Sequence, residues 1–281
     1  MWSLPLPSHT ADSAYRVCIS RVRDAELKQR LVGFESSVSD AAARFEEAAR
    51  AEALFTLNSV TFAPASEKDR VDLTKVYTDR MAKNGAPGRA IYDALKLAAK
   101  RCPLCGHRDV ATLDHHLPKA GYPFLSVAPA NLVPACSDCN KIKSDAFPST
   151  AEEQTLHPYF DDIDHDQWLS AEVVPGRPPS LKFFVDPPQQ WSTCLTARVR
   201  HHFATFGLSV LYSVQAATEL SEIAHALRIQ FDVAGEEGVR GYVEQVAASR
   251  SAVHLNSWRA ATYRALASSS WYCSGGFSFD W

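Results

Sequence analysis

Four cysteines in two pairs have the spacing of a metal site: Cys102-Pro-Leu-Cys105 and Cys136-Ser-Asp-Cys139. In a Cys-x-x-Cys turn both thiolates can face one ion, and two such turns complete the tetrahedron that Zn²⁺ prefers. The alternative is a redox pair, which neither motif favours, because neither follows a thioredoxin-like strand. We therefore expect one structural Zn²⁺, which four cysteines would enclose without leaving a position for substrate.

The segments between and after these pairs carry further reactive side chains. They read Leu113-Asp114-His115-His116-Leu117-Pro118-Lys119, Asn131-Leu132-Val133-Pro134 and Cys139-Asn140-Lys141-Ile142-Lys143. This order resembles the HNH, or ββα-metal, nuclease family, in which Asp-His-x-x-Pro lies on a first strand, an Asn precedes a second strand and another Asn lies on the following helix. The resemblance covers residues 102–143 of 281 and implies a metal-dependent endonuclease.

The residue types suit that chemistry. Phosphodiester hydrolysis needs an activated water and a cation that relieves the charge on the phosphoryl and leaving oxygens. Mg²⁺ or Mn²⁺ accepts oxygen ligands, so Asp114 and Asn140 are the expected ligands of the catalytic ion. A histidine titrates near neutral pH and is a natural general base, and the resemblance gives this role to His115. The resemblance also implies that Asn131 orients His115 by bracing the hairpin loop.

Strand geometry alone makes His116 an alternative to His115 as the general base. On a regular strand Asp114 and His116 would share one face while His115 pointed to the other. Periodicity therefore favours His116 as the partner of Asp114, whereas the family spacing, with Pro118 four residues after Asp114, favours His115. We follow the resemblance and expect His116 to be a packed or supporting side chain.

Three lysines are candidates for substrate phosphate binding: Lys119, Lys141 and Lys143. Asn140 and Lys143 are three residues apart, so they should share one helix face and place an ammonium beside a metal ligand. The alternative for each lysine is a solvated surface charge.

The surrounding sequence predicts a mainly α protein with this small ββα-metal zinc module embedded in it, α+β overall. Apolar periodicity predicts helices over residues 22–57, broken near Gly33, and over 67–82, 88–101, 137–146, 194–232, 236–250 and 256–269. Short strands are expected at Ala111–Leu113, Leu132–Val133 and Ser180–Val185. We expect three segments: a helical region over 1–97, the nuclease module over 98–147, and a loop-rich stretch leading into a helical region over 148–281.

Composition narrows the setting. The net charge of −3 does not indicate a nucleic-acid-binding protein, so any site for a polyanion would be a local basic patch. No apolar run is long enough for a membrane span, and no signal peptide is recognisable, so we expect a cytoplasmic protein without membrane contact. Cys18, Cys194 and Cys273 are expected to be buried apolar residues, His157 a structural histidine, and the acidic stretch Asp161–Asp166 a solvated loop.

The sequence thus predicts an enzyme that cuts DNA, with RNA not excluded, and leaves 5′-phosphate and 3′-hydroxyl ends. The alternative is a catalytically inactive, zinc-stabilised nucleic-acid-binding module. The flanking regions resemble HNH proteins of bacterial anti-phage defence loci, some of which work beside an ATPase subunit. That resemblance makes an ATPase subunit a candidate partner. The apolar segment 194–232 must be buried, and we expect it to pack in the core against the N-terminal helices, with contact to a second copy of the chain in a homodimer, or to another partner, as the alternative.

Overall fold

The computed structural model describes residues 1–278 and is mainly helical. It divides into two compact units, Met1–Asp162 and Ile163–Trp281. Among the described residues no helix combines the length and the apolar character that crossing a bilayer requires.

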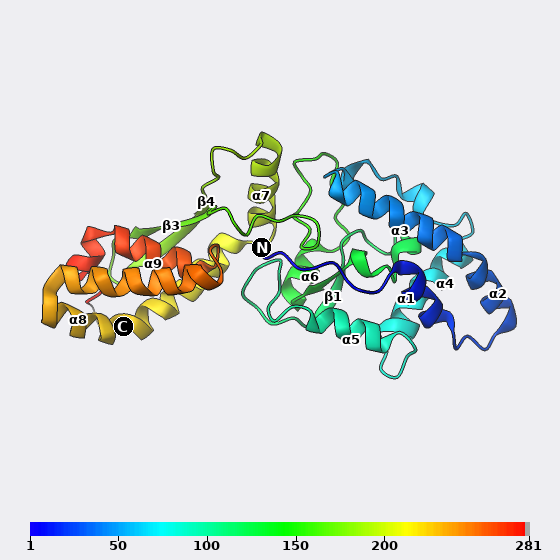
Figure 1. The fold of residues 1–281 in the computed structure, drawn as a ribbon, viewed down its shortest axis with the longest axis horizontal. Coiled ribbons are helices and arrows are strands. Elements are labelled where there is room, and N and C mark those ends of the chain that lie inside the picture. The colour runs from blue at the N-terminus through cyan, green and yellow to red at the C-terminus, as the bar shows by residue number, and fades with distance from the viewer. Residues whose placement is uncertain (279–281) are drawn as a thin grey trace. The chain divides into compact units, whose positions relative to one another are not determined.

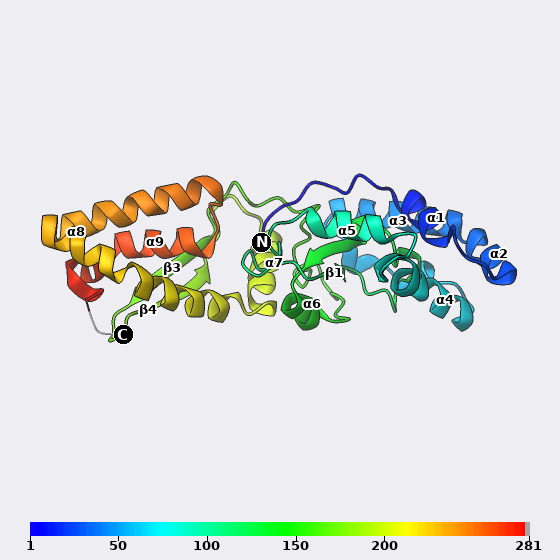
Figure 2. The ribbon, with the colours of Figure 1, turned by 90° about the horizontal axis from the view of Figure 1, so that it is seen from below.

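The first unit surrounds a short hairpin with helices. Its longer helices are α1 (Ala11–Ile19), α2 (Ala25–Gly33), α3 (Glu35–Arg50), α4 (Glu67–Tyr77) and α5 (Arg89–Leu97). Strands β1 (Thr112–His115) and β2 (Leu132–Ala135) pair antiparallel, and α6 (Ser137–Lys143) follows directly. Figures 1 and 2 show the hairpin between α5 and α6, both of which contact β1.

Helix starts in this unit follow local capping chemistry. Thr10, Asp24 and Ser66 each accept a hydrogen bond from a backbone N–H of the first turn of α1, α2 and α4. Such caps satisfy donors that a helix leaves without partners at its N-terminus. Helix α1 was not predicted. The predicted break near Gly33 is confirmed, because α2 ends at Gly33 and α3 begins at Glu35.

One hydrophobic core joins these helices to the hairpin loop. Buried side chains of α1, α3 and α4, including Tyr15, Phe45 and Leu73, form a cluster that continues through Leu117 and Leu125 in the loop between β1 and β2. The predicted boundaries at residues 97 and 147 both fall within this unit, and the core crosses the first of them. The loop is therefore as buried as the helices that hold it.

The second unit combines a hairpin with long helices. Strands β3 (Leu169–Val174) and β4 (Ser180–Val185) pair antiparallel. Helices α7 (Thr193–Thr205), α8 (Leu208–Val253) and α9 (Trp258–Ser268) complete the unit, with α8 against β4 and α9 against β3 (Figure 1). The expected strand at Ser180–Val185 is confirmed, whereas its partner β3 was missed.

Gly207 divides the predicted helix 194–232, whereas the predicted break between residues 232 and 236 is confirmed at Gly235. Gly207, at φ 58°, separates α7 from α8, and Gly235, at φ 60°, turns α8 back on itself. Both conformations are left-handed, which glycine adopts without the clash that a Cβ would bring. Helix α8 is thus a helical hairpin, and its buried side chains pack within the second unit against β4 and α9.

Two smaller expectations need correction. Asp161 is buried, and its Oδ2 accepts a hydrogen bond from the His157 backbone N–H at 2.7 Å, so the acidic stretch is not simply a solvated loop. Cys18 and Cys273 are buried as predicted, but Cys194 is only half-buried.

Candidate functional site

The four paired cysteines form one buried cluster. The Sγ atoms of Cys102, Cys105, Cys136 and Cys139 all lie within 4.8 Å of one another. Ligands at about 2.3 Å from a tetrahedral Zn²⁺ stand roughly 3.8 Å apart, so the cluster has the size that zinc requires. The predicted four-cysteine set is therefore confirmed as a possible zinc site.

Local backbone structure aims these thiols inward. The Gly106 N–H donates to the Cys102 carbonyl at 2.8 Å, and Gly106 has φ +61°, which closes the first turn tightly. Cys136 is the N-cap of α6, and its Sγ accepts a hydrogen bond from the Cys139 N–H at 3.3 Å. Hydrogen bonding, first with the Cys102 thiol, lowers the pKa of Cys136 to about 7. A lowered pKa favours the thiolate form, which is the form that binds a metal ion.

A segment from the start of the chain covers the first cysteine turn. The Trp2 N–H donates to the Pro103 carbonyl at 3.0 Å, and a Cβ at Gly106 would lie 3.2 Å from the Trp2 indole nitrogen. A side chain at position 106 would thus collide with this indole. No local motif marks Trp2 as a neighbour of the cysteine turn, so this contact could not be predicted.

The antiparallel register of the hairpin sets Asp114 opposite Val133 and His115 opposite Leu132. The Asp114 carboxylate is buried, and its Oδ2 accepts no hydrogen bond from the described residues. The Lys143 ammonium, also buried, lies 3.3 Å from that oxygen and donates to the His115 carbonyl at 2.8 Å. Burial raises the pKa of Asp114 to about 6, against the opposing effect of Lys143. Helix α6 therefore delivers a cation to the carboxylate on β1.

The His115 ring is held on two sides. Its Nε2 lies 2.8 Å from the Ser126 carbonyl, and its ring meets that of Tyr77 edge-on with centroids 4.4 Å apart. A carbonyl only accepts, so Nε2 must carry the hydrogen, which leaves the Nδ1 lone pair as the acceptor. Burial lowers the pKa of His115 to about 3, so the imidazole is neutral at pH 7. Neither Tyr77 nor Ser126 was predicted, because neither belongs to a local motif.

His116 has a different environment. Its backbone N–H donates to the Asn131 carbonyl at 2.8 Å, and its ring packs against that of His157 with centroids 4.2 Å apart. His157 is itself buried and contacts Phe45 and Phe160. His116 thus packs against a buried histidine that itself contacts two phenylalanine rings.

Asn131 ties the hairpin loop together. Its fully buried side chain accepts from the Leu117 N–H at 2.7 Å and donates to the Leu117 carbonyl at 3.0 Å. A longer bond of 3.4 Å reaches the Leu125 carbonyl. These bonds fix the backbone that follows His115 and leads to Ser126.

The other predicted polar residues differ in exposure. Asn140 is half-buried on α6, one turn before Lys143, and its side chain makes no hydrogen bond with the described residues. The Lys119 ammonium lies 5.4 Å above the Tyr77 ring, close enough to Asp114 and His115 to act on the pKa of both. Lys141 is exposed and belongs to no contact that joins it to this cluster. Lys143, expected as a phosphate contact, instead points inward to Asp114.

Comparisons with known proteins give one relative. No family model and no solved structure matches the chain. Protein ea31 of Escherichia phage lambda is 30% identical to it over 233 residues, which cover 79% of each chain. The alignment is long enough on both sides to establish common descent, and the chain belongs to the family of the phage lambda protein ea31.

Proposed function

We propose that this protein is a metal-dependent HNH endonuclease that hydrolyses DNA phosphodiester bonds. The observation that carries the proposal is the convergence of Asp114, His115 and the Lys143 ammonium on a β1–β2–α6 unit stapled by four cysteines. The order strand, strand, helix and the positions of Asp114, His115, Asn131 and Asn140 on it are those expected from the HNH resemblance.

The residues present fit a hard divalent cation. Asp114 Oδ2 is a buried carboxylate oxygen that lies 3.3 Å from the Lys143 ammonium and makes no other hydrogen bond with the described residues, so a divalent ion would bind beside or in place of that ammonium. Carboxylate and amide oxygens are ligands that Mg²⁺ and Mn²⁺ accept, so Asp114 and Asn140 would hold the ion. Bound there, it would neutralise charge on the phosphoryl and leaving 3′-oxygens.

His115 is suited to remove a proton from the attacking water. Its Nε2–H donates to the Ser126 carbonyl, which fixes the ring and leaves Nδ1 as the base. Because burial keeps the imidazole neutral, its lone pair is available at pH 7. Attack on phosphorus with departure of the 3′-oxygen leaves 5′-phosphate and 3′-hydroxyl ends. Asn131 acts as a positioning residue through the loop that carries Ser126.

The lysines would divide the work of binding the substrate. Lys119 forms no ion pair with the described residues and lies beside the Tyr77 ring that contacts His115, so it is the best placed phosphate contact. Lys141 is exposed on α6 and would contact a more distant phosphate. Lys143 would reach a phosphate only after leaving Asp114.

The test compares two adjacent histidines. His115→Ala should lower cleavage of plasmid DNA by about 10²–10⁴-fold in Mg²⁺ or Mn²⁺ while zinc content and fold are kept. His116→Ala is the matched control and should cost much less in cleavage. Equal or reversed losses would remove His115 from the role of base, and unchanged cleavage in a chelator that leaves the zinc in place would exclude the metal mechanism.

One observation favours a second candidate, an inactive zinc-stabilised nucleic-acid-binding module. The Lys143 ammonium already balances the Asp114 carboxylate without a metal ion, and a histidine with a pKa of about 3 is a weak base. DNA binding without cleavage in either metal, unaffected by His115→Ala, would support this candidate. Under both proposals the bound nucleic acid is DNA, and RNA should be assayed in parallel. The proposed biological context is anti-phage defence, with a homodimer or an ATPase subunit as the protein partner.

A further inference from the structure

The β3–β4 hairpin has two outer edges, and the hydrogen bonds show which backbone groups face them. The Asp186 N–H donates to the Trp168 carbonyl at 2.8 Å, so Trp168 faces β4. Antiparallel pairing alternates, so Leu169, Ala171 and Val173 direct their N–H and C=O groups away from β4. The Leu169 N–H confirms the alternation, since it donates to Asn256 Oδ1.

Side chains cover some of these outward groups on each edge. On the β4 edge the hydroxyls of Ser209 and Ser213, from α8, donate to the carbonyls of Phe183 and Leu181 at 3.0 and 2.7 Å. On the β3 edge Leu169 is satisfied at both ends, because Arg264 also donates to its carbonyl at 2.9 Å. Proteins commonly cover strand edges because open edges pair with other chains.

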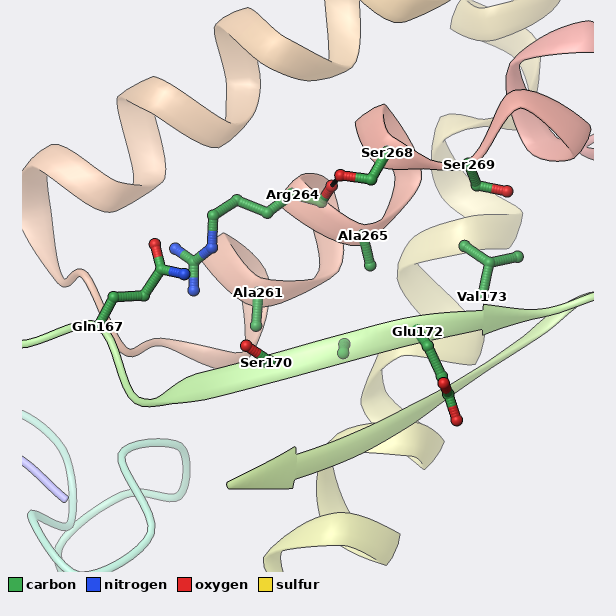
Figure 3. Close-up of a pocket in the computed structure, with 10 residues that line it drawn as sticks. Gln167, Ser170, Glu172, Val173, Ala261, Arg264, Ala265, Ser268 and Ser269 are labelled. Carbon is green, nitrogen blue, oxygen red and sulfur yellow. Dashed lines mark hydrogen bonds between the residues drawn. The ribbon is translucent and has the colours of Figure 1, made fainter. Parts of the chain in front are cut away.

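The rest of the β3 edge is open. No hydrogen bond from the described residues reaches the outward N–H and C=O groups of Ala171 and Val173. These residues line a cavity of about 460 Å³ between the strand and α9 (Figure 3). Four consecutive residues of β3, Ser170 to Val173, border it, as expected for a space that runs along an edge rather than over a face.

The walls of this groove define its chemistry. From α9 it is bordered by the small side chains of Ala261, Ala265 and Ser268, which leave room beside the strand, and by Arg264, whose guanidinium donates to the Leu169 carbonyl. Figure 3 shows Val173 pointing toward α9 and Glu172 pointing to the other side of β3. Glu172 is exposed and forms an ion pair at 3.1 Å with Lys182, its direct neighbour on β4.

We infer that this edge binds an extended segment of a different protein, which adds to the hairpin as a third strand. Ala171 and Val173 supply two N–H and two C=O groups for it. Its side chains beside α9 occupy the room that Ala261 and Ala265 leave, and the residue opposite Glu172 is basic.

A second copy of this chain is a poorer occupant. Antiparallel self-pairing that uses both open residues must set Ala171 opposite Val173 of the other copy. That register places two Glu172 carboxylates directly opposite each other, and like charges in that position destabilise a pair. Charge therefore favours a different protein with a basic residue at this point.

The test uses the full chain and a displayed library of random linear peptides, followed by synthesis of the selected peptides. Selected peptides should carry a basic residue near their centre. Bound peptide should slow amide hydrogen exchange at Ala171 and Val173 by about tenfold or more. A selection that yields no peptide protecting these two amides overturns the inference.

Val173→Pro removes one outward N–H without breaking a bond to β4, so the hairpin should persist. It should weaken peptide binding by about tenfold or more, whereas Val173→Thr, which keeps the N–H, should not. If the proline variant does not fold, Ser268→Trp fills the groove from an exposed position, with Ser270→Trp as its control outside the groove. Unchanged binding in the proline or Ser268→Trp variants overturns the inference, and so does a dimer in solution that Val173→Pro dissociates.

Discussion

The ion pair between Lys143 and Asp114 should make the stability of the first unit depend on pH, and one substitution tests this. Both side chains are about 5% exposed, so solvent screens the pair little. At 3.3 Å and an effective dielectric constant of about 20, their attraction is about 5 kcal/mol. Removing one member of a buried pair typically costs about 3–5 kcal/mol, because the other charge stays buried.

Lys143→Met should therefore lower the unfolding temperature of the first unit at pH 8, without divalent ions, by on the order of 10 °C. The pKa of Asp114 is raised from 3.8 to about 6 in the folded chain, so the folded state binds the extra proton between these values. The contribution of this carboxyl to stability consequently falls as pH rises through that window. At pH 5 Asp114 is mostly neutral in the native protein as well, so the difference between native and variant should shrink.

Thermal unfolding followed by calorimetry or circular dichroism at pH 5 and pH 8 measures both effects. Mn²⁺ should restore stability to Lys143→Met at pH 8, because a bound cation replaces the missing ammonium beside Asp114. Lys141→Met is the control, since Lys141 is exposed on the same helix. Equal unfolding temperatures for the two variants at pH 8 would refute the electrostatic reasoning.

Three other outcomes follow from the same geometry. Asn131→Ala should destabilise the first unit by about 2–5 kcal/mol in denaturant unfolding, because the buried N–H and C=O of Leu117 each lose a partner worth about 1–3 kcal/mol; a loss below about 0.5 kcal/mol would contradict this. Cys139→Ser should reduce zinc below one ion per chain in elemental analysis and destabilise the same unit, while Cys194→Ser keeps its zinc; a zinc-free native protein would exclude the site. Affinity for Mn²⁺ should fall about tenfold per pH unit below pH 6 as Asp114 takes up a proton, and titration calorimetry measures this. An affinity unchanged from pH 7.5 to pH 5 would show that this carboxyl is not a ligand.

Sequence reasoning succeeded where chemistry is local. Cys-x-x-Cys spacing predicted the thiol cluster, and apolar periodicity predicted most helices, because both depend on residues within a few positions of one another. The strand at Ser180–Val185 alternates buried and exposed residues and was recognised, whereas Leu169–Val174 buries only its first residue fully and was missed.

Contacts between distant segments could not be predicted. Tyr77 and Ser126 hold His115 from α4 and from the hairpin loop, and neither carries a motif. Lys143 shows the other limit: helical spacing placed it correctly relative to Asn140, but only the packing of α6 on β1 turned it toward Asp114.

The buried hairpin loop has a consequence for protein engineering. The Ser126 hydroxyl donates to the Leu73 carbonyl, and the Tyr122 hydroxyl donates to the Leu57 carbonyl, so the loop is bonded to segments far upstream. Its apolar side chains also belong to the core formed by α1, α3 and α4. A fragment cut to residues 98–147 would expose that surface and lose those bonds, even with its zinc cysteines intact. The zinc-binding segment should therefore not fold when transferred alone to another protein. A chimera between relatives would have to exchange the whole unit Met1–Asp162.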